Sequence, residues 1–472
     1  MSPIRRWLLP AATVLALTAS MAPSASAAAP AAPTCDTTSE AFNYVVIYNP
    51  HTPQFVVDKE LKAKCGTRVS YYPEIGVAVA SSRNADFQAK VGEFRAYSGS
   101  REVAFPPASA AAAQRREIVA ELENEETREV VAAADVSAQQ WDMRAIHAPE
   151  ANKINPGSKN VTVGVLDSGI DAKHPALAAA VDAKQSANCN SGSPDTAPDS
   201  WLPTTSDHGT HVAGTIAGKD DAVKFTGVAP GVKLASVKVV SDAGYIFPEA
   251  AVCGFMWAAK QGMEVTNNSY YIDPGMFYCR KQAGDAAAYE AVRRAVTYSN
   301  NHGVLNIAAA GNSGFDVTKQ TTDENRPHPV DSTCGILPKA IDGVITVSAV
   351  GYAGTKSSYS NFGAGQTDVT APGGDRAQLP PAGQGAGCPL SSVFGGVYGT
   401  KCGTSMASPH AAGVAALLAS KYRFAPPALL TWLLERQADP VACGAAAPTC
   451  TGPANNNSYY GHGLVNALDA VK

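Results

Sequence analysis

The chain has 472 residues, of which 45% are apolar and 17% are charged, and its formal net charge is −4. This composition is ordinary for globular protein, and the length allows roughly two or three folded units. A net charge so close to zero gives no electrostatic reason to expect nucleic acid or an anionic membrane surface as a partner. Function must therefore be inferred from a local site.

The first 27 residues have the features of a secretory signal peptide. Arg5 and Arg6 precede an apolar stretch at 7–19, and residues 25–27 read Ala-Ser-Ala, an A-x-A cleavage signature. An uncleaved anchor is the alternative, and the flanking residues fit a twin-arginine signal poorly. No later stretch reaches the roughly 18 apolar residues of a membrane span. We therefore expect a secreted, extracellular protein with no membrane association after signal cleavage.

All ten cysteines follow this segment. An even number of cysteines in an exported chain predicts disulfides. Position or proximity along the chain suggests three pairs: Cys35 with Cys65, Cys388 with Cys402, and Cys443 with Cys450. The partners of the other four stay open. There is no C-x-x-C, which disfavours a zinc site or a thioredoxin-type redox centre.

Residues 35–105 predict a small separate domain. Strand and helix patterns alternate in the order β-α-β-β-α-β, which is that of a ferredoxin-like α+β domain. The strands are expected at 42–49, 67–72, 75–82 and 100–105, and the helices at 55–64 and 85–94. Residues 106–135 are rich in alanine and in charged residues and contain no aromatic residue. They predict an exposed helical or disordered linker that proteases can cut.

Residues 136–472 alternate strands with helices, which predicts an α/β domain with a mainly parallel sheet covered on both faces. Strands are expected at 160–169, 232–240, 264–269, 304–312 and 344–350, and helices at 208–218, 248–262, 286–303 and after Ser405. In such sheets, binding sites form at the carboxyl ends of the strands. Asp167, Ser269 and Asn312 all lie at predicted strand ends.

Three segments suggest a nucleophilic site. Asp167 closes the strand "VTVGVLD", His208 opens the helix "HGTHVAGTIAG", and Ser405 opens a helix of small residues after "GT". A serine nucleophile needs a base to take its proton and a carboxylate to orient that base. Histidine suits the base because its pKa lies near neutral pH. Each segment alone is weak, but together they favour a Ser/His/Asp triad over packing residues.

The stretches "VGVLDSGID", "HGTHVAGTIAG" and "GTSMASPHAAGVAALL" closely resemble the active-site motifs of the subtilisin-like serine proteases. The resemblance covers about residues 136–472. It implies a three-layer α/β sandwich and a serine endopeptidase that forms an acyl-enzyme on protein or peptide substrates. By position, residues 35–105 resemble the inhibitory propeptide of that family, so the chain's own small domain would inhibit it. Maturation would then cut the linker at 106–135.

The resemblance also implies further roles. "AAAGNSG" resembles the family's oxyanion motif, so Asn312 would donate its side-chain amide to the developing oxyanion, with the backbone N–H of Ser405 as second donor. "KVVSDAGYIF" resembles the segment that pairs with an extended peptide. "NNSYY" aligns with the family's "NMSLG" beside the pocket for the residue before the cut. The substrate-binding residues implied are Gly244, Tyr245, Ile246, Ser269, Tyr270, Tyr271, Ala309, Ala310 and Gly311.

Two departures from the family pattern matter. Tyr270 and Tyr271 replace a leucine and a glycine, so the usual preference for large apolar residues is in doubt, and an exopeptidase or a dedicated processing enzyme is an alternative. Ala176 stands where many relatives have an aspartate that binds calcium, so that site is expected to be absent. No cofactor is required, although structural calcium elsewhere stays open.

Other candidates have plainer interpretations. His211 is expected to be structural, because a zinc site needs a third ligand. His174 and His410 are expected to be packing or capping residues, and Asp171 and Asp207 local hydrogen-bonding groups. His51, His147, His302, His328 and His462 are expected to be solvated. A non-catalytic binding protein on a protease scaffold is the competing function class, and nothing suggests an oligomer.

Overall fold

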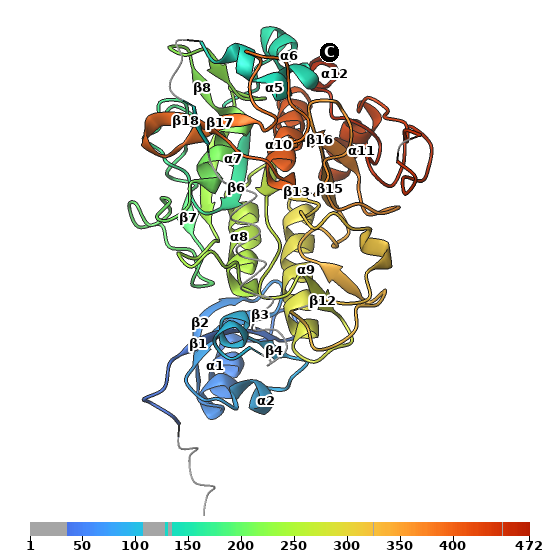
Figure 1. Cartoon of the computed structure of the whole chain (residues 1–472). Helices are drawn as coiled ribbons and strands as arrows, with labels where there is room; N and C mark the ends of the chain where they lie inside the picture. The colour runs from blue at the N-terminus through green and yellow to red at the C-terminus, as the bar shows by residue number, and fades with distance from the viewer. Residues whose placement is uncertain (1–34, 107–127, 131–134, 324, 446) are drawn as a thin grey trace, which may run out of the picture.

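The computed structural model describes residues 35–106, 128–130, 135–323, 325–445 and 447–472 (Figure 1). The predicted signal peptide and most of the predicted linker lie outside the described residues. Within the linker, strand β5 (Arg128–Val130) pairs antiparallel with β18 (Val397–Thr400). No helix in the described part of the chain is long and apolar enough to cross a membrane.

The small domain forms a four-stranded antiparallel sheet in the order β2-β3-β1-β4. This order confirms the predicted ferredoxin-like fold. Its elements are β1 (Phe42–Ile47), α1 (Gln54–Ala63), β2 (Gly66–Tyr72), β3 (Val77–Ser82), α2 (Phe87–Val91), β4 (Ala96–Tyr97) and α3 (Gly99–Ala104).

The prediction of a strand at 100–105 is wrong, because α3 occupies this stretch and the last strand, β4, comes earlier. The hydroxyl of Ser98 accepts a hydrogen bond from the Arg101 backbone N–H at 3.2 Å. Such an N-cap, followed by an acidic residue in the first turn, stabilises a helix start. That acidic residue is Glu102.

The larger domain is built on a seven-stranded parallel sheet in the order β16-β15-β13-β11-β6-β10-β7. Strands β6, β11, β13 and β15 are buried along their whole length, as expected for a parallel sheet covered on both faces, and β6 and β15 are rich in valine. The strands are β6 (Thr162–Asp167), β7 (Ala187–Asn188), β10 (Lys233–Lys238), β11 (Val265–Asn268), β13 (Leu305–Ala309), β15 (Val344–Val350) and β16 (Val369–Pro372).

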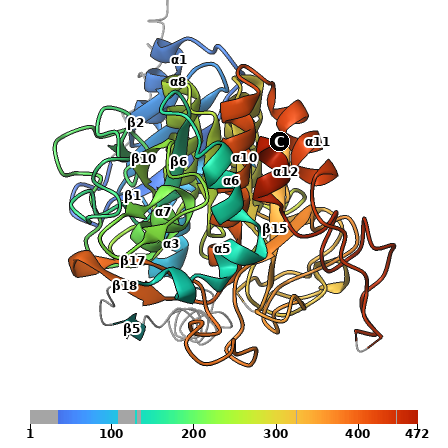
Figure 2. The same cartoon turned by 90° about the horizontal axis from the view of Figure 1, so that it is seen from above.

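Helices cover both faces of this sheet, which confirms the predicted three-layer sandwich. One apolar core joins the sheet to α7 (His208–Ala217) and α10 (Thr404–Lys421), and a second joins it to α8 (Pro248–Gln261) and α9 (Asp285–Asn301). The C-terminal helix α12 packs on α6 near the start of the domain (Figure 2). The remaining elements are α5 (Trp141–Ala145), α6 (Ala148–Ile154), β8 (Lys219–Asp220), β9 (Phe225–Thr226), β12 (Phe277–Cys279), β14 (Cys334–Ile336), β17 (Leu390–Val393), α11 (Pro427–Arg436) and α12 (Ala467–Val471).

All ten cysteines form disulfides. The pairs Cys35–Cys65, Cys388–Cys402 and Cys443–Cys450 are as predicted, and the four that stayed open form Cys189–Cys253 and Cys279–Cys334. The Cys189–Cys253 bond ties the loop after β7 to α8, and Cys279–Cys334 joins β12 to β14.

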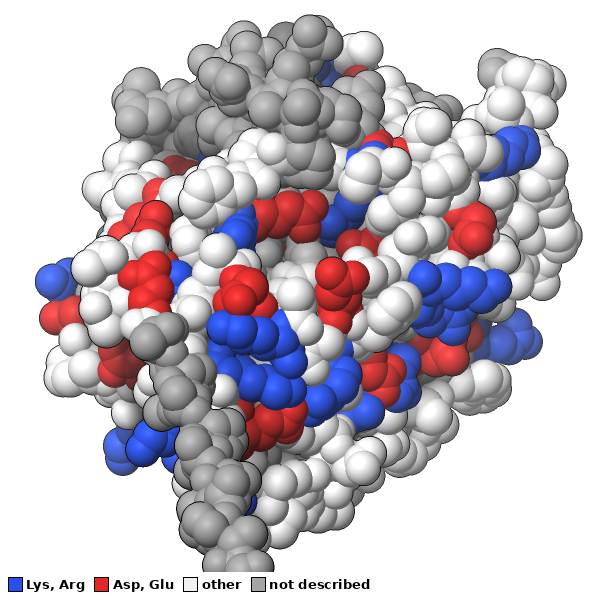
Figure 3. Space-filling view, turned by 90° about the horizontal axis from the view of Figure 1, so that it is seen from below, with Lys and Arg blue, Asp and Glu red and all other residues white. Residues whose placement is uncertain are grey.

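The sheet of the small domain lies on α8 and α9 (Figure 1). Val45, Val77 and Tyr97 belong to the same buried apolar cluster as the facing residues of these two helices. Arg294 of α9 donates hydrogen bonds to the carbonyl oxygens of Tyr48 and Ile75 at 2.7 and 2.8 Å. On the face that includes the small domain, acidic and basic side chains are interspersed, in line with the small net charge (Figure 3).

Candidate active site

Asp167 and His208 form a hydrogen-bonded pair at the carboxyl edge of the sheet. Asp167 ends the central strand β6 and is 1% exposed, while His208 is the first residue of α7. His208 Nδ1 lies 2.8 Å from Asp167 Oδ1 and 3.0 Å from Oδ2. Because a carboxylate can only accept, the hydrogen lies on Nδ1 and Nε2 is the basic nitrogen. This is the orientation that a general base requires.

Glycine next to His208 lets α7 start close to β6. A Cβ at Gly209 would lie 2.4 Å from the carbonyl oxygen of Gly169. Ser168 binds both the carboxylate and the start of the helix. Its N–H donates to Asp167 Oδ1 at 2.7 Å, and its hydroxyl accepts from the Gly209 N–H at 3.0 Å. The carboxylate and the helix start are therefore held by one residue.

Ser405 lies in the first turn of α10, beside the end of β11. Its hydroxyl donates to the carbonyl oxygen of Ser269 at 3.3 Å, and the Ser269 hydroxyl donates to the Ser405 carbonyl oxygen at 2.8 Å. An ion pair of 3.1 Å between Lys401 and Asp207 ties the segment before Ser405 to the residue before His208. The starts of α7 and α10 are thus joined by direct contacts.

Asn312 lies against the start of α10. Its Oδ1 accepts from the Thr404 N–H at 2.9 Å and from the Thr404 hydroxyl at 2.8 Å. A Cβ at Gly403 would lie 3.6 Å from Asn312 Nδ2 and 3.6 Å from Ser405 N. Two N–H groups within reach of one point can hold a developing oxyanion.

The motif match extends to known proteins. The family model described as "Subtilase family" matches residues 158–463. Subtilisin DY from Bacillus licheniformis is 31% identical over 313 residues, which cover 66% of this chain and 91% of that protein. Subtilisin E from Bacillus subtilis is 30% identical over 339 residues, covering 70% of this chain and 71% of that protein.

This chain belongs to the subtilase family. It is a serine peptidase, as the motifs predicted. The fold agrees with that of the epidermin leader peptide processing serine protease from Staphylococcus aureus, with a TM-score of 0.66 at 21% identity, covering 92% of this chain and 98% of that one. The arrangement of the site residues and the family both indicate serine peptidase chemistry.

Three residues of this subtilase support the site but were not singled out from the sequence. Thr404 orients Asn312 and also accepts from the Gly311 N–H through its hydroxyl at 3.0 Å. Gly403 leaves the space between the two donors empty, and Lys401 is 5% exposed beside Asp207. The "GT" before Ser405 was the available signal for the first two, whereas a lone lysine gives none.

The segment at 244–246 is partly engaged within this subtilase. Ile246 donates its N–H to Asp273 Oδ2 at 2.7 Å, and its carbonyl oxygen accepts from the Asp273 N–H at 2.8 Å. Gly244 has φ +87° and an open face, and the Tyr245 carbonyl oxygen accepts from the Ser241 N–H at 2.8 Å. Pairing of this segment with a peptide stays a prediction.

The other predicted substrate-binding residues, at 269–271 and 309–311, follow β11 and end β13. The Tyr270 hydroxyl donates to Asn268 Oδ1 at 3.0 Å. Tyr271 packs against an apolar cluster of Met276, Phe277, Val330 and Ile336. Ala309 ends β13, and Ala310 and Gly311 follow it toward Asn312. Both tyrosines are therefore anchored beside Ser269 rather than free in solvent.

Three other histidines, His174, His211 and His410, are buried. His211 is fully buried, and burial, followed by the charges of Lys401 and His208, holds its pKa well below the usual range. His174 Nε2 lies 2.9 Å from the Val397 carbonyl oxygen, and His410 Nε2 lies 3.0 Å from Asp142 in the core. His328 differs from expectation, since it pairs with Asp285 at 3.1 Å instead of being solvated.

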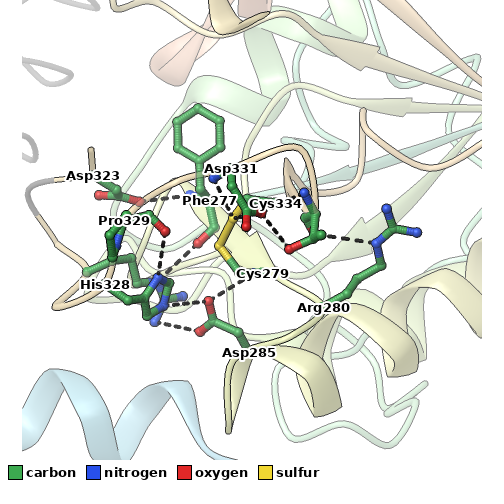
Figure 4. The surroundings of a disulfide bond; sticks show 11 residues. Phe277, Cys279, Arg280, Asp285, Asp323, His328, Pro329, Asp331 and Cys334 are labelled. Atoms are coloured by element: carbon green, nitrogen blue, oxygen red, sulfur yellow. Dashed lines mark hydrogen bonds and ion pairs between the residues drawn. A yellow bond between two sulfur atoms is a disulfide. The ribbon is translucent and has the colours of Figure 1, made fainter. Parts of the chain in front are cut away.

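The described residues contain one group of possible metal ligands, Cys279, Asp285 and His328. The Cys279 sulfur is already in the disulfide with Cys334, and the Asp285 carboxylate bonds to His328 (Figure 4). Donors used in this way do not suit a metal ion. Ala176 is 3% exposed and packs in an apolar cluster, so the residue itself offers no side-chain ligand.

Proposed function

We propose that this subtilase is a secreted serine endopeptidase made as a self-processing precursor. The observation that carries the proposal is the 2.8 Å pair of His208 and Asp167. The Lys401–Asp207 ion pair, which ties the segment before Ser405 to the residue before His208, supports it. Ser405 attacks the peptide carbonyl carbon while His208 Nε2 takes its proton. Asp167 stabilises the imidazolium, and Asn312 and the Ser405 N–H hold the oxyanion.

The same groups then complete the reaction. His208 gives its proton to the leaving amine, which departs and leaves an acyl group on Ser405. Water attacks this ester with His208 again as base, and His208 then returns the proton to Ser405 Oγ as the acid product leaves. The site residues at 244–246, 269–271 and 309–311 would hold the peptide on either side of the acylated residue.

In the precursor, the small domain is the inhibitor. Its sheet covers α8 and α9, and the chain leads from α3 through the linker toward the start of the catalytic domain. A cut in the linker would break the covalent connection between the two domains, and the apolar contacts would still hold them together. Activity would then appear when the small domain leaves.

The full-length Ser405→Ala precursor tests self-processing. It is expected to stay uncut on purification, whereas the wild type and Ser420→Ala, a variant at the far end of the same helix, yield a shortened chain. Mass spectrometry of each protein gives the result. Cutting of the Ser405→Ala protein without any added protease would show that processing does not depend on this serine.

Labelling with a fluorophosphonate separates the enzyme from a non-catalytic binding protein. The probe is expected to modify Ser405 in the processed protein and not in the Ser405→Ala variant. The amino terminus of the exported protein reports secretion, because cleavage near residue 27 would remove the signal. A protein retained with an intact amino terminus would contradict that part of the proposal.

A narrower activity is the second candidate. Tyr270 and Tyr271 are anchored beside Ser269 by a hydrogen bond and an apolar cluster. Rigid aromatic side chains next to the nucleophile favour a restricted substrate range, as in a dedicated processing enzyme. Profiling against a peptide library distinguishes the two, because a general endopeptidase cuts many sequences and a processing enzyme cuts few.

A further inference from the structure

A buried arginine of the catalytic domain binds a carboxylate of the small domain. Arg326, whose side chain is 2% exposed, places Nη1 2.9 Å from Glu102 Oε1. The second oxygen of Glu102 accepts from the Tyr97 hydroxyl at 2.6 Å. A largely buried guanidinium–carboxylate contact of this kind is strong and sensitive to geometry.

The catalytic domain holds this guanidinium without help from the small domain. Arg326 Nε donates to the Phe277 carbonyl oxygen at 3.1 Å, Nη1 lies 3.2 Å from Asp285 Oδ1, and the group stacks 4.4 Å above the ring of Tyr278. Arg326 Nη2 is buried and has no hydrogen-bond partner among the described residues. Loss of the small domain would therefore leave a fixed cation with unused donors.

The Asp285 carboxylate cannot serve as the sole counter-ion. It also accepts from the Cys279 N–H at 2.9 Å and pairs with His328 at 3.1 Å (Figure 4). The hydrogen bond that His328 donates to Asp285 raises the pKa of His328, which favours its charged form. One carboxylate thus faces two cationic groups, and a cavity of about 400 Å³ lined by both domains adjoins them.

This site is connected to the nucleophile by a continuous stretch of chain. Ser269, which contacts Ser405, leads through Asp273 to Phe277, which holds Arg326. Gly99, at the start of α3, lies against the Asp273 carbonyl oxygen, so the tail that carries Glu102 runs along the same wall. Because that tail comes before the linker, Glu102 lies upstream of the proposed cut, as the acidic residue of a substrate would.

We propose that Arg326 is a substrate-binding site of the activated enzyme, where it takes the carboxylate of a glutamate or aspartate upstream of the cleaved bond. The inference rests on the proposed protease function. In the precursor Glu102 fills the site, and in the activated enzyme an acidic residue of the substrate replaces it.

Paired peptides test the site. Internally quenched substrates of one core sequence carry glutamate or glutamine at each upstream position in turn. For the wild type, glutamate at one position is expected to raise kcat/KM about tenfold over glutamine, mainly through KM, as one buried charge-assisted bond would. Arg326→Gln is expected to bring this ratio to about one, while Arg280→Gln, which removes one surface cation nearby, keeps it.

The outcomes separate the two proposals. An enzyme that cuts the glutamine peptides but prefers glutamate nowhere, or an Arg326→Gln variant that keeps the preference, overturns the inference alone. Absence of cleavage in every peptide, together with no fluorophosphonate labelling of Ser405, would overturn the protease function and the inference with it.

A second variant tests the inference independently if Arg326→Gln does not fold. Glu102→Gln in the precursor leaves the catalytic domain unchanged, and it is expected to shorten the lag before activity appears about tenfold. Asp58→Asn, on the exposed side of the small domain, is the control and keeps the wild-type lag. An unchanged lag in Glu102→Gln would show that Arg326 does not bind a carboxylate tightly.

Discussion

The two ends of the Asn312 amide have separate tasks. Its oxygen is held by the backbone N–H and the hydroxyl of Thr404, and its nitrogen would lie 3.6 Å from a Cβ at Gly403. A donor that is already oriented needs no reorganisation when charge develops on the substrate oxygen. The value of this residue thus lies in the transition state rather than in the fold.

Asn312→Ala is therefore expected to lower kcat by about 10²–10³, a range that comes from subtilisin itself, while the unfolding temperature changes little. Ser313→Ala, whose hydroxyl makes one weak contact with the Met276 sulfur, is the matched control. Steady-state kinetics and thermal unfolding of both variants provide the measurement. Wild-type turnover in Asn312→Ala would remove this residue from the oxyanion site.

Residues with a local pattern could be predicted, and residues without one could not. Asp167, His208 and Ser405 each stand at a strand end or a helix start within a recognisable motif. Arg326 and Glu102 are 224 positions apart in the sequence, and Asp142 and His410 are 268 apart. A single charged residue in a polar loop or short helix carries no sign of its partner, so these pairs required the three-dimensional structure.

At the scale of elements, the small residues of α10 serve close packing. The helix is buried along nearly its whole length, between α7 on one side and the sheet on the other. At Gly413 an added Cβ would lie 2.5 Å from the Cβ of Val228, which is fully buried in the segment after β9. Alanine and glycine let the axis of α10 approach its neighbours, and this sets the depth of Ser405.

Gly413→Ala is expected to lower the free energy of unfolding by about 1–3 kcal/mol, because overpacking a dense core forces its neighbours to shift. The better helix propensity of alanine offsets at most about 1 kcal/mol of this cost. Gly444→Ala is the control, since a Cβ there meets no atom within 4 Å. Urea unfolding followed by fluorescence gives the comparison, and equal stability of the two variants would contradict the packing argument.

Element types were predictable where a pattern was long. Valine-rich strands and the small-residue helices of the larger domain were identified, because burial on both faces leaves continuous apolar runs. The short stretch at 100–105 was assigned to a strand but forms α3, since the N-cap at Ser98 outweighs the weak alternation that follows. The short ribbon β17–β18 lacked a pattern and was missed.

At the scale of the whole molecule, the small domain buries a glutamate of the catalytic domain. Glu249, in the first turn of α8, is 2% exposed, and its Oε2 has no hydrogen-bond partner among the described residues. A Cβ at Gly192 would lie 2.8 Å from Val79 of β3 and 3.0 Å from the Glu249 Cβ. Ser70 and Tyr72 donate to the Gly192 carbonyl oxygen at 2.5 and 2.9 Å, so the small domain covers this corner.

Burial raises the pKa of Glu249 from 4.5 to about 8, opposed only by a hydrogen bond from its own backbone. The other charged group facing this interface from α9, Arg294, is paired with Glu290 at 2.7 Å. If release exposes Glu249, the docked state binds the extra proton. Docking is then strongest below the free pKa and weakens as pH rises toward the docked pKa.

The dissociation constant of the small domain is therefore expected to rise with pH between these two values, by at most about tenfold per unit. The cleaved complex, blocked at Ser405 with a fluorophosphonate, permits the measurement without interference from turnover. Glu249→Gln removes the titration and should bind tightly with no such slope, whereas Glu435→Gln, on α11 at the other side of the sheet, keeps it. Equal slopes in the wild type and in Glu249→Gln would mean that another group governs release, and a tighter wild-type complex at high pH would reverse the sign argued here.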